Sequence, residues 1–316
     1  MKNKIKKLIC MTLTAVSLAT AVTAVQPVQV QASLGKYELK KLKVLSVKKH
    51  GKIGKVEYKA ANTSSQLDGY TKHINTVFDV AYTNTTSYPV RIQGKITFYR
   101  NGKKIVDCDD NSNKDKFVDL DDKIDVYLYP KQRLTDNYSL ATFRKKNMAD
   151  NYKISYTVKK VSDSEIKKKT KSYYSYSNAF LSEEAYNPEL TNLEYKEHAI
   201  DLSNGKYYSN DKALYLSCFE VDEYGIYCNI AFNKDVHYRS VSFGNMPEFG
   251  VTLYLYDKDG YFLDFKRFWH SSGTFKKGDH IYFDEYITTS EYDNYSIDDI
   301  ASFDIYLVSR EAEFKK

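Results

Sequence analysis

Short stretches in which apolar and polar residues alternate, or run apolar, recur along the chain between polar turns. Residues 76–82, 124–129 and 154–158 are examples. An alternation of period two is typical of a β-strand with one buried face. Beyond residue 32 no amphipathic pattern is long enough for a major helix, and only Leu140–Ala149 and Ser296–Ala301 favour single short helices. The pattern therefore predicts an all-β protein.

Two hairpins at corresponding places indicate an internal repeat. Ile96–Val106 has Asn101-Gly102 at its tip, and Leu253–Leu263 has Asp259-Gly260. These dipeptides readily adopt the left-handed backbone angles that a tight hairpin turn requires. Each hairpin is followed by a polar loop, a lysine-bearing turn and a strand, and then by a short helical stretch and a last strand. Similar order and spacing favour duplication of one domain.

The repeats set the expected domain boundaries. We expect a signal peptide over residues 1–32, a first domain over 36–160, a linker over 161–190 and a second domain over 191–316. The linker segment contains the lysine run 167–169 and the Tyr/Ser stretch 172–177. Its tyrosines would stack on sugar rings, pack on a neighbouring domain or lie in a partly ordered connection.

The second hairpin resembles a known signature. Leu253-Tyr254-Leu255-Tyr256-Asp257 is similar to the F-x-L-Y-D motif of FxLYD domains, found in secreted and envelope proteins of bacteria, and departs from it at Leu253. Ile96-Thr97-Phe98-Tyr99-Arg100 is a looser match that keeps Tyr99. The resemblance implies tandem immunoglobulin-like antiparallel β-sandwich domains that serve as envelope binding or spacer modules. It implies no catalytic residues.

The N-terminus has the pattern of a secretory signal peptide. Lysines 2, 4, 6 and 7 precede an apolar stretch over residues 8–24, and Val30-Gln31-Ala32 forms a small-residue cleavage site. An earlier cut after Ala24 and an uncleaved membrane anchor are the alternatives. No second stretch approaches the length of a membrane helix. We therefore expect a secreted, extracellular or cell-envelope protein of a Gram-positive bacterium.

Charge divides the chain into a basic and an acidic half. Residues 33–160 hold 26 Lys and Arg against 14 Asp and Glu, whereas residues 191–316 hold 13 against 22. In one interpretation the basic half contacts an anionic wall polymer, such as teichoic acid. In the other, the halves face each other or are both solvated. The candidate polyanion contacts are Lys40, Lys41, Lys43, Lys48 and Lys49.

Cysteines and the single tryptophan give the remaining candidate positions. If the hairpin around Glu223 were symmetric, Cys218 and Cys228 would face each other as a disulfide, whereas a shift of one residue would leave two thiols. Trp269 is either an exposed aromatic contact or part of the core. The acidic run 109–115 has the start of a calcium loop but lacks its glycine and its final acid, so an acidic surface loop is the stronger interpretation.

The sequence has no zinc-site spacing, nucleophile elbow, phosphate-binding glycine loop or dinucleotide fingerprint. We therefore expect a non-enzymatic binding module that needs no metal or cofactor and binds an anionic wall polymer or a protein partner, not nucleic acid. Two alternatives stay open at this stage. One is a secreted enzyme that acts on wall or host polysaccharide through carboxylates dispersed in the sequence. The other is a structural spacer.

Overall fold

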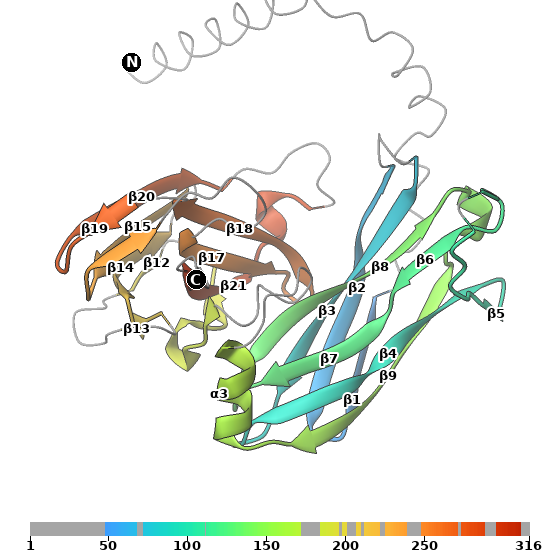
Figure 1. Ribbon diagram of the computed structural model, residues 1–316, viewed down its shortest axis with the longest axis horizontal. Helices are drawn as coiled ribbons and strands as arrows, with labels where there is room; N and C mark the ends of the chain where they lie inside the picture. The colour runs from blue at the N-terminus through green and yellow to red at the C-terminus, as the bar shows by residue number, and fades with distance from the viewer. Residues whose placement is uncertain are drawn as a thin grey trace, which may run out of the picture. The chain divides into compact units, whose positions relative to one another are not determined.

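The computed structural model (Figure 1) describes residues 48–67, 72–110, 112–171, 184–195, 198–200, 207–209, 212–221, 225–238, 248–270, 273–287 and 295–310. All of them belong to one compact unit, Val44–Lys316. The described part of the chain is mostly β, with several antiparallel sheets and one short α-helix. This confirms the all-β prediction. Within the described residues no helix is both long and apolar enough to cross a membrane.

The first half contains two antiparallel sheets. One has the order β1-β2-β3-β8-β6, and in the other β4 pairs with β5, β7 and β9. The strands are β1 (Lys49–Ile53), β2 (Val56–Leu67), β3 (Ile74–Asn84), β4 (Val90–Arg100), β5 (Lys103–Lys104), β6 (Val118–Asp121), β7 (Lys123–Leu128), β8 (Arg133–Thr142) and β9 (Asn151–Lys160).

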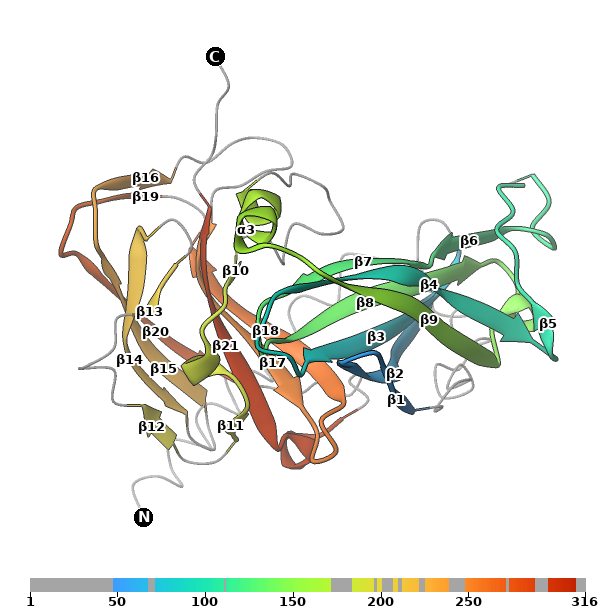
Figure 2. The ribbon, with the colours of Figure 1, turned by 90° about the horizontal axis from the view of Figure 1, so that it is seen from below.

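Alternation along the strands builds the core of this half. Phe78 and Tyr82 of β3 project into the same cluster as Ile96 of β4 and Tyr152 of β9, and all four are almost fully buried. Because one cluster draws side chains from both sheets, the two sheets are packed face to face. Figure 2 shows them as two layers. The arrangement is consistent with a β-sandwich.

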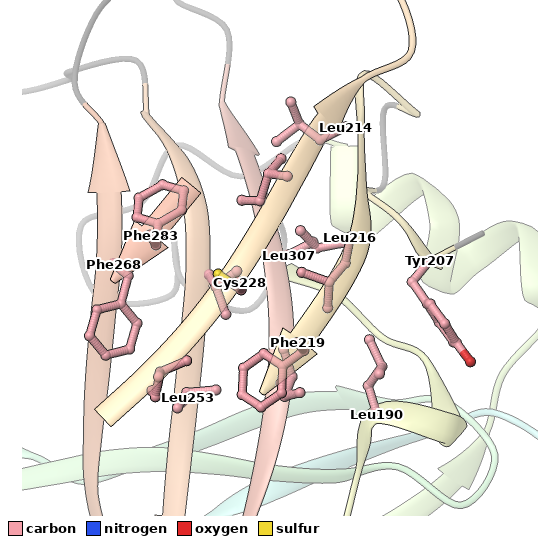
Figure 3. Packing of buried hydrophobic residues seen from close by; sticks show 14 of the residues in the cluster. Leu190, Tyr207, Leu214, Leu216, Phe219, Cys228, Leu253, Phe268, Phe283 and Leu307 are labelled. Carbon is pink, nitrogen blue, oxygen red and sulfur yellow. The ribbon is translucent and has the colours of Figure 1, made fainter. Parts of the chain in front are cut away.

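The second half has the same two-sheet plan. One sheet has the order β12-β14-β15-β20, and the other has β10-β21-β17-β18, while β16 pairs with β19. The strands are β10 (Glu184–Ala185), β11 (Leu193–Glu194), β12 (His198–Ile200), β13 (Tyr207–Tyr208), β14 (Leu214–Val221), β15 (Gly225–Phe232), β16 (Val236–Tyr238), β17 (Glu248–Tyr256), β18 (Phe262–His270), β19 (Gly273–Phe275), β20 (His280–Tyr286) and β21 (Ser302–Arg310). Figure 3 shows buried side chains of its core, among them Phe219, Leu253 and Phe283.

The two halves share strand order and backbone hydrogen bonds. The sheet β2-β3-β8 corresponds to β14-β15-β20, and β9-β4 corresponds to β21-β17. Three backbone hydrogen bonds outside the strand ladders recur at corresponding places. In the first half they join Asn84 N to Gln132 O, Thr85 N to Lys55 O, and Asp150 N to Tyr99 O. In the second half they join Phe232 N to Asp279 O, Asn233 N to Ala213 O, and Ala301 N to Tyr256 O. The same pairings recur among five strands in each half, so the likeness extends well beyond the hairpins.

Both predicted hairpins form. Asn101 and Gly102 have φ angles of 50° and 71°, and Gly260 has a φ of 75°. In the second hairpin the Asp257 carboxylate also accepts hydrogen bonds from the Asp259 and Tyr261 amides. Positive φ at these positions is what the Asn-Gly and Asp-Gly dipeptides supply at low steric cost.

One predicted helix is wrong. Leu140 belongs to β8, where it pairs with Thr76 of β3 and is fully buried, and only the 3₁₀ turn η2 (Lys145–Asn147) follows. Pairing with two neighbouring strands and burial of Leu140 outweigh its helix propensity. The other predicted helix is close to the observed 3₁₀ turn η4 (Ile297–Asp299), which has a capping box from Ser296.

The segment expected to be a linker is partly regular. Helix α3 (Asp163–Lys171) follows β9, and β10 pairs with β21 of the second half. Ser162 Oγ accepts a hydrogen bond from the Glu165 amide and so caps the helix N-terminus. Ile166 is almost fully buried and anchors it. A further 3₁₀ turn, η3 (Pro188–Leu190), precedes β11. The Tyr/Ser stretch 172–177 and the signal-peptide region lie outside the described residues.

Candidate functional site: the basic face of the first half

Lysines gather on the outer face of the sheet formed by β4, β7 and β9. In β9 the residues Tyr152, Ile154 and Tyr156 point into the core, which places the alternate residues Lys153 and Lys159 outward. The same alternation places Lys95 of β4 and Lys123 of β7 on this surface. We call these outward residues the basic face: Arg91, Gln93, Lys95, Thr97 and Tyr99 of β4, Lys123, Asp125 and Tyr127 of β7, and Asn151, Lys153, Ser155, Thr157 and Lys159 of β9.

The strand register brings three lysines together. Lys95 lies directly opposite Lys123 on one side and opposite Ser155 on the other, while Lys153 is two residues from Ser155 along β9. Directly opposite residues have Cβ atoms about 4.5–5.5 Å apart, and diagonal neighbours are about 7–8 Å apart. Like charges in these positions repel each other. An anion bound between them would relieve that repulsion.

The face has little negative charge to offset its lysines. Its acidic residue, Asp125, is held in a bidentate pair by Arg91, with both nitrogen–oxygen distances at 2.7 Å. This hydrogen bonding raises the pKa of Arg91, whose guanidinium also lies over the Tyr127 ring. Within the described part of the chain, Lys95, Lys123 and Lys153 are exposed and form no ion pair. Their charge is therefore accessible to an external anion.

The lysines proposed from sequence are placed elsewhere. Lys40, Lys41 and Lys43 lie outside the described residues. Lys48 forms a 2.6 Å ion pair with Asp257 of the second half. Lys49 Nζ donates to Asn151 Oδ1 and to the Tyr152 carbonyl oxygen, and burial lowers its pKa. Both described lysines therefore have partners within the chain, whereas Lys95, Lys123 and Lys153 form no ion pair with any described residue.

Sequence reasoning missed the basic face although a local signal exists in β9. The run from Tyr152 to Lys160 alternates buried residues with exposed polar ones. That alternation shows that Lys153 and Lys159 share a surface. Nothing local shows that Lys95 and Lys123 are their neighbours, because strand pairing between distant segments decides it.

Some cations of the basic half contact acceptors of the acidic half within the molecule. Arg133 of β8 pairs with Asp304 of β21 at 2.6 Å, where Asp304 is fully buried, and its guanidinium lies 3.4 Å from the centre of the Tyr256 ring. Lys59 Nζ donates to the Asp259 carbonyl oxygen. In these contacts the basic half supplies the cation. The interpretation in which the halves face each other thus accounts for some charges, but not for those on the basic face.

Apolar packing accompanies these polar contacts. Ala81 of β3 joins one buried cluster with Tyr254, Tyr256, Phe262 and Tyr306 of the second half. Tyr254 and Tyr256 alternate with Leu253 and Leu255, which point into the second half's own core. Alternate residues of the hairpin motif therefore pack into two different buried clusters.

The disulfide that the sequence allowed is absent, because Cys218 and Cys228 are free thiols. Cys228 pairs with Phe219, and Cys218 pairs with Asn229, after a register shift between Leu216 and Cys218. This bulge directs Cys218 to the exposed face, whereas Cys228 is buried in the core, as Figure 3 shows. Burial raises the pKa of Cys228 to about 12.

The other sequence candidates are placed as follows. Trp269 is in β18, where its backbone pairs with Gly250, and its side chain lies outside the described part. Its neighbours Phe265 and Phe268 are exposed and buried, respectively. In the acidic loop, Asp115 lies 3.0 Å from Arg144 and 3.3 Å from Lys146. Across the described residues, no group of three or more His, Cys, Asp or Glu is arranged to hold a metal ion.

One carboxyl group has a strongly perturbed pKa. Burial raises the pKa of Asp136 to about 6. Its Oδ2 accepts a 2.8 Å hydrogen bond from the Tyr138 hydroxyl, which also lies 3.0 Å from the Tyr82 hydroxyl. Both tyrosines belong to the core of the first half. This network lies in the core of the first half and does not form part of the basic face.

No family model matches the chain, and no curated protein is significantly similar to it in sequence. The site must therefore be interpreted from its own geometry.

Proposed function

We propose that the protein is a secreted, non-enzymatic binding protein that holds an anionic polymer of the cell envelope on the basic face. The observation that carries this proposal is the group Lys95, Lys123 and Lys153, brought together by strand pairing without an ion-pair partner among the described residues. Ammonium groups on flexible stems suit phosphates repeated along a polymer, because each lysine acts as an adaptable point charge.

The fold assignment extends this proposal. The shared register of the two halves supports an origin by duplication, and the hairpins support two FxLYD-like domains with an immunoglobulin-like topology. The signal-peptide pattern supports export to the surface of a Gram-positive cell. A teichoic acid of the wall would meet the basic face there.

Co-sedimentation with purified Gram-positive cell walls tests this function. The mature protein should pellet with walls, and it should remain in solution when the walls have been stripped of teichoic acid. The variant Lys95→Gln/Lys123→Gln/Lys153→Gln should lose most of the pelleted fraction. A matched variant, Lys55→Gln/Lys116→Gln/Lys145→Gln, removes the same charge from other exposed sites of the first half and should pellet normally. An equal loss of pelleted protein in both variants would contradict specific binding at the basic face.

A further inference from the structure

A second exposed surface lies on the second half, on the outer face of β15 and β20, which Figure 1 shows side by side. Tyr227 of β15 is 36% exposed, and Tyr282 and Tyr286 of β20 are 74% and 69% exposed. A contiguous patch of exposed apolar surface can mark an interaction site. The neighbouring residues indicate what the partner's chemistry is.

The three tyrosines surround a carboxylate. Asp284 lies directly opposite Tyr227 and midway between Tyr282 and Tyr286 on β20. On the other side of Tyr227, β14 places Glu220 directly opposite it. Residues two apart on a strand are about 6.6–6.8 Å apart, so these rings border Asp284 on three sides. We call these five residues the tyrosine–carboxylate face.

Elsewhere in this chain, an aspartate and a tyrosine ring together hold a cationic side chain. Among the described residues, a cation pairs with an aspartate and also lies over a tyrosine ring in four places. They are Arg133 with Asp304 and Tyr256, Lys48 with Asp257 and Tyr261, Lys266 with Asp264 and Tyr295, and Arg91 with Asp125 and Tyr127. In each set the carboxylate supplies the charge and the ring supplies a cation–π contact.

Asp284 has the same surroundings, but no lysine or arginine of the described residues pairs with it. We propose that the tyrosine–carboxylate face binds lysine or arginine side chains of a basic polypeptide partner. The net negative charge of residues 191–316 would also attract such a partner over a longer distance. This surface is separate from the basic face and its proposal stands independently.

The spacing favours an extended polypeptide over a small amine. Tyr282, Asp284 and Tyr286 follow one another at the two-residue interval of a strand. An extended segment with basic residues at alternate positions presents its side chains at the same interval. Several cationic side chains could therefore contact the face at once, which a single ammonium compound cannot do.

Fluorescence anisotropy with a labelled peptide of alternating arginine and threonine tests the proposal on the mature protein. The same peptide with citrulline in place of arginine keeps nearly the same shape but has no charge and fewer N–H donors. We expect saturable binding of the arginine peptide and no measurable binding of the citrulline peptide. Asp284→Asn and Tyr282→Ala should each weaken binding about two- to five-fold, the range for an exposed ion pair or cation–π contact.

Asp298→Asn is the matched control, because it removes one exposed carboxylate elsewhere in the same half. It should leave the affinity unchanged. Equal weakening by Asp298→Asn, or equal binding of the citrulline peptide, would overturn the proposal. It would also be overturned if no peptide bound. If instead Asp284→Asn abolished a salt-sensitive self-association of the protein, the occupant would be the basic face of a second copy.

Discussion

Arg133 and Asp304 form a bidentate ion pair between the two halves of the chain, with nitrogen–oxygen distances of 2.9 and 2.6 Å. The Asp304 side chain is fully buried, and its Oδ1 also accepts a hydrogen bond from the Asn192 amide. The Tyr306 hydroxyl donates to the Arg133 carbonyl oxygen. This pair therefore ties β8 to β21 through both side-chain and backbone groups.

Loss of one partner should destabilise the protein strongly. Arg133→Met leaves the Asp304 carboxylate buried without its cation, although the Asn192 amide and the Tyr256 hydroxyl still hydrogen-bond to it. Breaking a buried ion pair in this way costs about 3–5 kcal/mol in the free energy of unfolding. Urea denaturation followed by tyrosine fluorescence should show this loss. The double variant Arg133→Met/Asp304→Asn keeps the acceptor for Asn192 and should recover part of it. A single variant with unchanged stability would contradict the structural role.

Gly94 is expected to tolerate no side chain. A Cβ atom there would come within 2.0 Å of the Ser155 carbonyl oxygen and 2.5 Å of the Tyr156 Cα. Gly94→Ala should reduce the free energy of unfolding by about 1–3 kcal/mol, because β4 and β9 must separate locally. Gly102→Asn is the control, since its Cβ would meet nothing within 4 Å and asparagine adopts positive φ. Equal stability of the two variants in urea denaturation would show that the strands can adjust.

Asp136 should make stability depend on pH. Its pKa of about 6 in the folded state exceeds the value of about 3.9 expected in the unfolded chain. Between these values the folded state binds the proton more tightly, so the contribution of Asp136 to stability falls as pH rises from 4 to 6. Asp136→Asn removes this titration. The melting temperature of the variant relative to the native protein should be higher at pH 7 than at pH 4, and a constant difference would contradict the raised pKa.

The two cysteines of the second half should differ in reactivity. Cys218 is exposed, whereas burial raises the pKa of Cys228 to about 12 and so keeps it a thiol. In the folded protein a thiol reagent should modify Cys218 rapidly and Cys228 only after unfolding. Cys218→Ser should remove the rapid phase, which mass spectrometry of the labelled peptides would locate. Labelling of both cysteines only after reduction would instead show that they are bonded.

Local chemistry made part of this structure predictable. The hairpin tips at Asn101-Gly102 and Asp259-Gly260 follow from the few residues that readily adopt positive φ. The alternation of β9 likewise predicts a strand with one buried face. These features depend on sequence neighbours, so the sequence alone was sufficient.

The features that could not be predicted depend on contacts between segments that are distant in sequence. A bulge between Leu216 and Cys218 placed the two cysteines on opposite faces, and no local signal specified it. Helix α3 was missed because its polar composition is typical of a linker, whereas the burial of Ile166 depends on the neighbouring fold. Lys95 and Lys123 became neighbours only through the pairing of β4 with β7. The candidate site therefore required the structure.

The most direct test of the proposed function is the salt dependence of binding to purified wall teichoic acid. Each phosphate contact made by a lysine adds about 0.7–0.9 to the slope of log Kd against log salt concentration, by analogy with nucleic acids. Replacing Lys95, Lys123 and Lys153 by glutamine should lower that slope by about two and weaken binding, whereas the Lys55, Lys116 and Lys145 control should keep the native slope. Identical slopes for the two triple variants would contradict binding at the basic face.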